Sequence, residues 1–244
     1  MLDGLYAAAA GMQAQQTQLD AVANDLANES TPGYQAAQVG FHDLLYTSGG
    51  ASSGSRVATG AGAASAVIGR SQVQGSLQPT GQPLDVAIQG PGYIEVRRPD
   101  GSVGLTRNGV LELNANRQLT TSVGMPLQPS ITIPSGIDVS QVKIDPNGTV
   151  HVGARTLGRI SLVDVPAPDK LLADGNSVFS PTAASGAVRR AAGTTVQQGS
   201  IEASNVDAAS AMSTMLTTQR AYSMDSKAIQ YQDQMAQIAN QVKK

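Results

Sequence analysis

The first thirty residues carry apolar side chains in a heptad pattern. Steps of alternately three and four residues connect Leu2, Leu5, Ala9, Met12, Gln16, Leu19, Ala23 and Leu26, and only Gln16 in this series is polar. Such spacing places one apolar face of an α-helix against a neighbouring helix. Thr31-Pro32-Gly33 then predicts a stop, because proline removes a backbone donor and glycine permits positive φ. The pattern therefore predicts one amphipathic helix over residues 1–30.

The last part of the chain, residues 201–244, has a similar pattern. A second series of heptad steps runs through Met224, Ala228, Tyr231, Met235, Ile238 and Val242, and a displaced stripe upstream contains Ala208, Met212, Met215 and Tyr222. No glycine or proline follows Gly199, which favours one long helix with two contact faces. Each stripe is also compatible with the core face of an ordinary domain.

The middle of the chain, residues 75–180, has the period of β-strands. Apolar and polar positions alternate over residues 84–88 and 93–96, and short apolar segments recur at 142–144, 149–152 and 159–163. Asp100-Gly101, Asn108-Gly109 and Asn147-Gly148 are typical of tight hairpin turns. Short strands separated by frequent turns predict a mainly antiparallel β-domain.

These zones predict a mixed α and β fold. The N- and C-terminal helices pair as an α-helical coiled-coil domain, residues 1–47 with 194–244, and the antiparallel β-domain, residues 75–180, is inserted between them. Residues 48–74 and 181–193 are rich in Gly, Ser and Ala and are expected to form flexible connectors.

Composition excludes several classes of function. The 244 residues contain 16 basic and 18 acidic side chains, a net charge of −2, which gives no basic footprint for nucleic acid. The absence of cysteine excludes disulfides, thiolate metal sites and thiol catalysis. Six tyrosines, two phenylalanines and no tryptophan make a dense single core difficult to build, so contacts between copies are expected to add stability.

Candidate catalytic and ligand sites are weak. The two histidines, His42 and His151, lie far apart in the sequence, and Gly60-Ala-Gly62 is only a fragment of a dinucleotide-binding loop. The segment from Asp145 to Gly148 lacks most ligands of a calcium loop, and a β-turn is the better interpretation. We therefore expect no catalytic, cofactor or metal site, although a periplasmic glycan hydrolase on the β-domain remains an alternative function.

The first helix instead carries many uncharged hydrogen-bonding groups, among them Gln15, Gln16, Asn24 and Asn28. Amides can join closely packed helices without the desolvation cost of charges. The residues predicted to pack helices during assembly are Leu5, Met12, Leu19, Asn24, Leu26, Asn28, Met215, Tyr222, Met224, Tyr231, Met235 and Ile238.

Several sequence blocks resemble the bacterial flagellar rod and hook proteins. The N-terminal blocks are AGMQAQQ (10–16), LDAVANDLAN (19–28) and TPGY (31–34), which include Gly11, Gln15, Gln16, Thr31, Gly33 and Tyr34. GSLQPTG (75–81) and LDVAIQGPGY (84–93) resemble the entry into the family's β-domain. QGSIEASNV (198–206) and QRAY (219–222), with Gln219 and Arg220, are similar to its C-terminal signature. The block FHDLLY (41–46) is most similar to distal rod proteins.

The resemblance implies a structural subunit that polymerises helically into the hollow axial shaft of the basal body, where it transmits torque to the hook. Its implied partners are copies of itself, other rod and hook subunits, the rings around the rod and the flagellar export apparatus, with no nucleic acid and no membrane insertion. It also implies export to the periplasmic rod without a cleaved signal peptide, in line with an opening sequence whose first Lys or Arg is Arg56. A proximal rod or hook-type protein, and a coiled-coil adhesin or export partner that does not polymerise, are the remaining alternatives.

Overall fold

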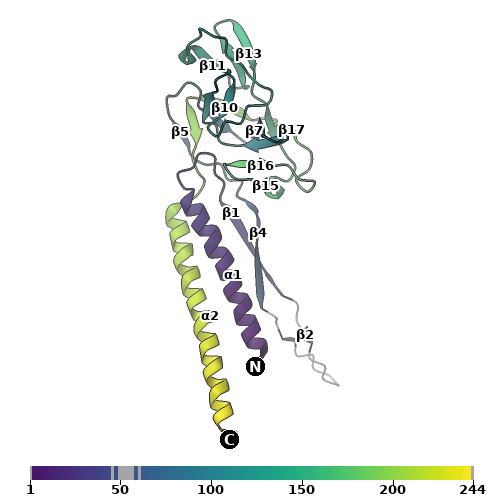
Figure 1. The fold of residues 1–244 in the computed structure, drawn as a ribbon, viewed down its shortest axis with the longest axis vertical. Helices are drawn as coiled ribbons and strands as arrows, with labels where there is room; N and C mark the ends of the chain where they lie inside the picture. Colours follow the sequence, from purple (N-terminus) through teal and green to yellow (C-terminus); the bar gives the residue numbers. More distant parts are fainter. Residues whose placement is uncertain (1, 45–46, 49–57, 60–61, 243–244) are drawn as a thin grey trace. The chain divides into compact units, whose positions relative to one another are not determined.

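A computed structural model describes residues 2–44, 47–48, 58–59 and 62–242. The chain divides into two units (Figure 1). Unit 1 consists of Met1–Ala27, Ala37–Ile68 and Asp207–Lys244, and unit 2 of Asn28–Ala36 and Gly69–Val206. The backbone therefore passes between the units four times, after residues 27, 36, 68 and 206. Residues 194–206, which the sequence pattern groups with the helices, belong to unit 2.

Unit 1 contains two long helices, and the N-terminal one agrees with the heptad pattern. Helix α1 (Leu2–Ala27) is followed by a turn in which the Thr31 N–H donates to the Asn28 carbonyl at 3.1 Å. Near its end, the carboxylate of Asp25 accepts the N–H of Ala37 at 2.9 Å. This bond fixes the first residue of strand β1 (Ala37–Asp43) beside the helix.

The C-terminal helix α2 (Ala208–Val242) begins later than residue 201, where the sequence pattern placed the last zone. Residues 200–202 form a strand instead, because their backbone pairs with residues 77–79. Asp207 then sets the start of the helix, since its Oδ1 accepts the N–H groups of Ala209 and Ser210 at 2.9 and 3.2 Å. An aspartate in this position satisfies donors that have no partner inside the helix.

The two helices run antiparallel along each other (Figure 1). Gly4 of α1 lies against Gln232 of α2, and Gly11 lies against Asp225, so one heptad of each helix separates the two contacts. A two-stranded ribbon of β1 and β4 (Ala63–Arg70) also packs on α1, with the Ser65 hydroxyl donating to the Ala14 carbonyl at 3.1 Å. The strands β2 (Thr47–Ser48) and β3 (Ala58–Thr59) complete the described part of unit 1.

Unit 2 is a mainly antiparallel β body, as the alternation over residues 75–180 predicts. Its largest sheet has the order β15 (Leu172–Ala173), β16 (Val178–Ser180), β8 (Val103–Thr106), β7 (Tyr93–Arg97), β14 (Leu162–Asp164) and β17 (Arg189–Arg190). A three-stranded sheet contains β11 (Val142–Ile144), β12 (Thr149–Val152) and β13 (Arg155–Arg159). Three further strand pairs are β5 (Leu77–Pro79) with β19 (Ser200–Glu202), β6 (Val86–Gln89) with β18 (Thr195–Gln198), and β9 (Leu111–Leu113) with β10 (Leu119–Thr121). Two short 3-10 helices, η1 (Val139–Gln141) and η2 (Pro168–Lys170), lie in the connections between strands.

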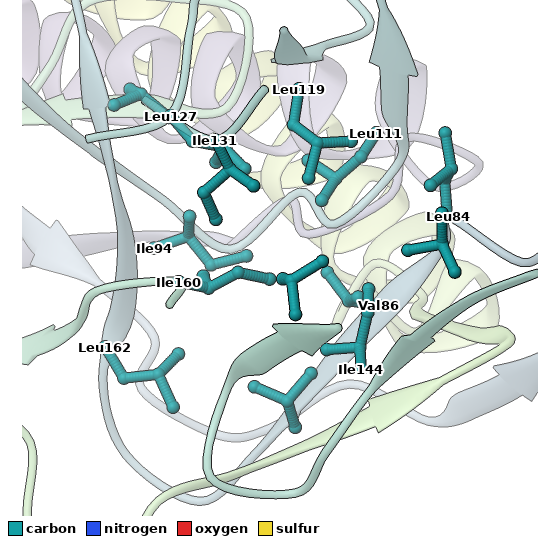
Figure 2. Close-up of a cluster of buried hydrophobic side chains, with 14 of the residues drawn as sticks. Leu84, Val86, Ile94, Leu111, Leu119, Leu127, Ile131, Ile144, Ile160 and Leu162 are labelled. Atoms are coloured by element: carbon teal, nitrogen blue, oxygen red, sulfur yellow. The ribbon is translucent and has the colours of Figure 1, made fainter. Parts of the chain in front are cut away.

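The aliphatic core of unit 2 lies between these sheets (Figure 2). Val86, Ile88, Ile94, Val96 and Leu119 have no exposed surface, although they come from three different strands. A second cluster contains Tyr93 and Phe179, whose rings meet edge to face at 5.8 Å. The few aromatic residues are thus compensated here by β-branched and leucine side chains, which pack densely between sheets.

Two details of the predicted strands are wrong. Asn108-Gly109 is not a hairpin turn: Gly109 lies directly on the backbone of Val86, where a Cβ would come within 1.6 Å of the Val86 carbonyl oxygen. The glycine is required for this close approach, and its carbonyl accepts the Val86 N–H at 2.9 Å. Residues 159–163 are not one strand either, because the chain leaves β13 at Arg159 and enters another sheet at Leu162.

Candidate assembly surfaces

Helix α2 carries large apolar side chains in contact with solvent. Met224, Tyr231, Met235 and Ile238 are 65, 63, 58 and 60% exposed, and their spacing of seven, four and three residues forms one stripe. Met212 and Leu216 add a second exposed group near the start of the helix. Soluble monomers rarely leave a contiguous apolar stripe uncovered, so this surface is typical of an interface.

The predicted seam of α1 lies beside its contact with α2 rather than within it. Leu5, Met12, Leu19 and Leu26 are half-buried, whereas Ala9, Gln16 and Ala23 of the same series are exposed. The most buried positions of α1 are Ala14, Ala21, Val22 and Asp25, which lie on another face. The chain's own fold therefore uses small residues where α1 touches its neighbours and leaves part of the larger side chains uncovered.

The remaining predicted packing residues are spread over the surfaces of the helices. Met215 is half-buried and Tyr222 is exposed on α2, whereas Asn24 is exposed and Asn28 half-buried at the end of α1. The side-chain oxygen of Asn28 accepts the Thr31 hydroxyl at 3.2 Å, so Asn28 shapes the turn after the helix. Of the predicted packing residues, Met224, Tyr231, Met235 and Ile238 of α2 are those that form an exposed apolar stripe.

The family-motif residues of α1 and α2 differ in their contacts and exposure. Gly11 allows α1 to approach Asp225, and Gln16 donates to the Asp20 carboxylate at 2.8 Å on the exposed side. Gln15 is half-buried, and Gln219 and Arg220 are both exposed on α2.

Gly33 and Tyr34 of the TPGY block lie in unit 2. Gly33 has φ of +67°, and a Cβ there would lie 2.5 Å from the Asn108 backbone nitrogen. Its N–H donates to the carbonyl of Glu202 at 2.8 Å, which joins the segment after α1 to the segment before α2. Tyr34 accepts a hydrogen bond from Arg70 at 3.0 Å, and the guanidinium also stacks over the tyrosine ring. The TPGY block therefore fixes the segment that follows α1 to the segment that precedes α2.

A buried ion pair holds the same region together. The Nε atom of Arg107 lies 2.9 Å from Glu202 Oε2, and the two side chains are only 4 and 3% exposed. Arg107 also donates to the carbonyls of Gly92 and Gly90 at 3.0 and 3.2 Å, and Glu202 Oε1 accepts the Gly75 N–H at 3.0 Å. Every strong polar group of the pair therefore has a partner, as a buried ion pair requires.

The side chain of Asn205 adds three hydrogen bonds in the same region of unit 2. Its side chain accepts the Ala36 N–H at 2.7 Å and donates to the carbonyls of Ser71 and Val73 at 3.1 and 2.8 Å. The sequence reasoning missed the roles of Arg107, Glu202 and Arg70. Their partners lie far away in the chain, and the only sequence signal was that Glu202 and Asn205 stand inside a family block.

The described residues contain no metal-binding constellation. No group of three or more His, Asp or Glu side chains lies close enough there to hold a metal ion. His42 is exposed, and His151 lies 3.5 Å from Asp145 in a half-buried pair. Across the described helices, no stretch is long and apolar enough to cross a membrane. The exposed apolar stripe of α2, by contrast, is the kind of surface with which a protein contacts other subunits.

Comparisons with known proteins agree with this interpretation. Three family models match: the flagellar basal-body rod protein model at residues 5–35, the hook protein FlgE/F/G D1 domain at 87–152, and the FlgEFG C-terminal model at 197–242. The flagellar basal-body rod protein FlgG of Borreliella burgdorferi is 35% identical over the full length of both chains. FlgG of Caulobacter vibrioides is 37% identical over 99% of this chain and all of its own, and the rod protein FlgF of Mesorhizobium japonicum is 30% identical over 91% and 90%.

The chain therefore belongs to the flagellar rod and hook protein family, and it is a structural subunit of the flagellar basal-body rod. The resemblance seen in the sequence blocks is confirmed. Membership of a structural family sets aside the glycan hydrolase, and the full-length match sets aside an adhesin that does not polymerise.

Proposed function

We propose that this subunit forms the distal part of the rod. The observation that supports this proposal is the sequence similarity over the whole chain, which is greater to FlgG than to FlgF. FlgG is a distal rod protein. The block at 41–46 also supports this position, although Leu45 and Tyr46 lie outside the described residues. Electron microscopy of basal bodies that contain a tagged subunit tests the assignment, and label confined to the proximal rod would contradict it.

The helices of unit 1 supply the contacts between copies. The exposed stripe of Met224, Tyr231, Met235 and Ile238 packs on helices of neighbouring subunits, in a coiled-coil manner, together with Leu5, Met12, Leu19 and Leu26 of α1. Repeated heterologous contacts whose rotation does not close build an open helical filament rather than a ring. In this proposal unit 1 forms the axial core and unit 2 the outer domain.

The rings around the rod and the flagellar export apparatus are further proposed partners. Delivery through that apparatus would leave the subunit's N-terminus uncleaved in the periplasmic rod. Mass spectrometry of the subunit from purified basal bodies measures this directly.

A single charge on the stripe tests the helix contacts. Ile238→Asp, and Leu19→Asp on α1, should abolish rod assembly and motility, because a carboxylate would be buried against apolar neighbours. The unassembled Ile238→Asp variant should unfold at the same urea concentration as the parent protein, since Ile238 is 60% exposed.

Gln230→Asp is the matched control, because Gln230 is an exposed residue of the same helix outside the stripe. It should leave rods intact. Intact rods and normal motility in Ile238→Asp and Leu19→Asp would show that these residues are not at an interface.

A further inference from the structure

Unit 2 carries a groove whose rim is rich in arginine. Arg159, Arg189 and Arg190 line it together with apolar side chains that include Ile160, Leu162 and Val188, and its volume is about 510 Å³. All three arginines are exposed, and within the described residues none lies within ion-pair distance of an acid. The one carboxylate in the lining, Glu95, accepts the Ser161 hydroxyl at 2.9 Å.

The arginines are held in place by the fold. Arg189 and Arg190 form β17, which is the edge strand of the six-stranded sheet and pairs with Asp164 and Val163 of β14. Arg159 donates from Nε to the Asn147 carbonyl at 2.9 Å, which fixes the base of its guanidinium. An apolar centre with a charged rim is typical of protein interfaces. Because the rim is positively charged, a complementary partner carries negative charge.

A second groove of unit 2 has the complementary charge. Asp85, Glu112 and Asp138 line it with an apolar floor that includes Leu84, Leu111 and Val139, and no basic residue contributes to its lining. Its volume is about 560 Å³. Glu112 and Asp138 are exposed, and hydrogen bonds from the backbone and hydroxyl of Ser140 hold the pKa of Asp138 below its ordinary value.

The two grooves share no lining residue and carry opposite charges. Within the described residues, no ion pair joins a side chain of one groove to a side chain of the other. The charges of each groove can therefore be complemented by those of a second copy.

We propose that the rim of the arginine groove of one subunit contacts the rim of the acidic groove of the next subunit, so that β bodies meet through Arg159, Arg189 and Arg190 against Glu112 and Asp138. The proposal rests on the proposed function, because a second copy of this chain is the occupant. The contact is heterologous: each subunit presents two different surfaces and so can extend an open filament. It adds a lateral connection between β bodies to the helix contacts of unit 1.

The lack of cysteine in the chain allows a clean cross-linking test. The single variants Arg190→Cys and Asp138→Cys are expressed together in the parent bacterium, and basal bodies are treated with a mild oxidant. A disulfide-linked dimer should form from the mixture, and a ladder from the double variant, whereas neither single variant should cross-link alone. Asp100→Cys is the matched control for Asp138→Cys, since both aspartates are exposed and accept the N–H of a serine two residues later.

Charge reversal supplies an independent measurement. Arg189→Glu with Arg190→Glu should reduce the number of assembled rods about tenfold, as expected when close charge pairs are lost. Adding Glu112→Lys and Asp138→Lys to the same chain should restore assembly. Arg155→Glu, an exposed arginine of β13 outside the groove, should have no effect.

Intact rods without the specific cross-link, equal cross-linking with Asp100→Cys, or reversal without rescue would each overturn the proposal, and the last would indicate a different anionic partner. If the unaltered subunit were absent from basal bodies, the proposed function itself would fail. The two failures are therefore distinguishable.

Discussion

Unit 1 and unit 2 differ in how completely they bury their large apolar side chains. Unit 2 encloses Ile88, Ile94 and Leu119 completely and also buries an ion pair with full hydrogen bonding. Unit 1 buries mainly alanine and valine on α1 and leaves Met224 and Ile238 more than half exposed. Apolar burial contributes about 25 cal/mol per Å², so unit 2 is stabilised within one subunit, whereas unit 1 gains much of its burial only from neighbours.

The comparison teaches how one chain can be both a folded body and an incomplete interface. The small number of aromatic residues does not mean that the chain lacks a hydrophobic core, because aliphatic residues are concentrated in unit 2. Alanine and glycine allow close helix contacts in unit 1, and the larger apolar residues remain for other copies. Three changes measure this difference in the unassembled, full-length protein.

The largest expected effect concerns the buried ion pair of unit 2. Glu202→Ala removes the carboxylate that Arg107 and the Gly75 N–H both use, and it leaves a buried guanidinium without its counter-charge. We expect a loss of about 3–5 kcal/mol in the free energy of unfolding, measured by urea and circular dichroism.

Asp145→Ala is the control, because the Asp145–His151 pair keeps partial contact with solvent and should contribute less than about 1 kcal/mol. Equal effects of Glu202→Ala and Asp145→Ala would mean that the buried pair contributes no more than a surface pair.

A pair of identical substitutions contrasts the two units directly. Ile94→Ala should cost about 2–5 kcal/mol of stability because Ile94 is fully buried and its removal leaves a cavity. Ile238→Ala should change the stability of the unassembled protein by less than about 0.5 kcal/mol. Urea titration of both variants provides the measurement, and a large loss for Ile238→Ala would show that α2 is already packed in the single subunit.

The smallest effect concerns Tyr93. Its hydroxyl donates to Gln72 Oε1 at 3.0 Å, and burial raises the pKa of the phenol above its ordinary value of 10.0, against the opposing effect of Arg107. The neutral phenol is therefore favoured in the folded state, and the stability that it contributes is present below pH 10 and lost as the pH rises through the folded-state pKa.

Tyr93→Phe should cost about 1 kcal/mol near pH 7 through the lost hydrogen bond. Above pH 10, its stability should fall less steeply than that of the parent protein. Unfolding curves at a series of pH values measure this slope, and parallel slopes in the two proteins would contradict the assignment.

Elements with a strong local signal were predictable from the sequence. The heptad pattern and the TPG stop predicted α1, and alternation with Asn147-Gly148 predicted β11, β12 and the turn between them. Asn108-Gly109 was misassigned because the same dipeptide can serve a close backbone approach instead of a turn. Strand β19 was missed because only its pairing with β5, more than a hundred residues earlier, distinguishes it from a helix start.

The candidate surfaces were predictable only in part. Hydrophobicity selected Leu5, Met12 and Ile238, but it could not reveal that α1 approaches α2 at Gly4 and Gly11. The ion pair of Arg107 and Glu202 depends on residues 95 positions apart, and no local pattern signals it. The arginine groove likewise combines side chains from separate strands, so its charge is visible only in the folded unit.

The four backbone passages between the units have a consequence for cleavage of the chain. In unit 2, hydrogen bonds of Gly33, Arg70, Glu202 and Asn205 hold the segments next to these passages. A protease that cuts one passage leaves three covalent connections in place, so a single cut does not separate the two units.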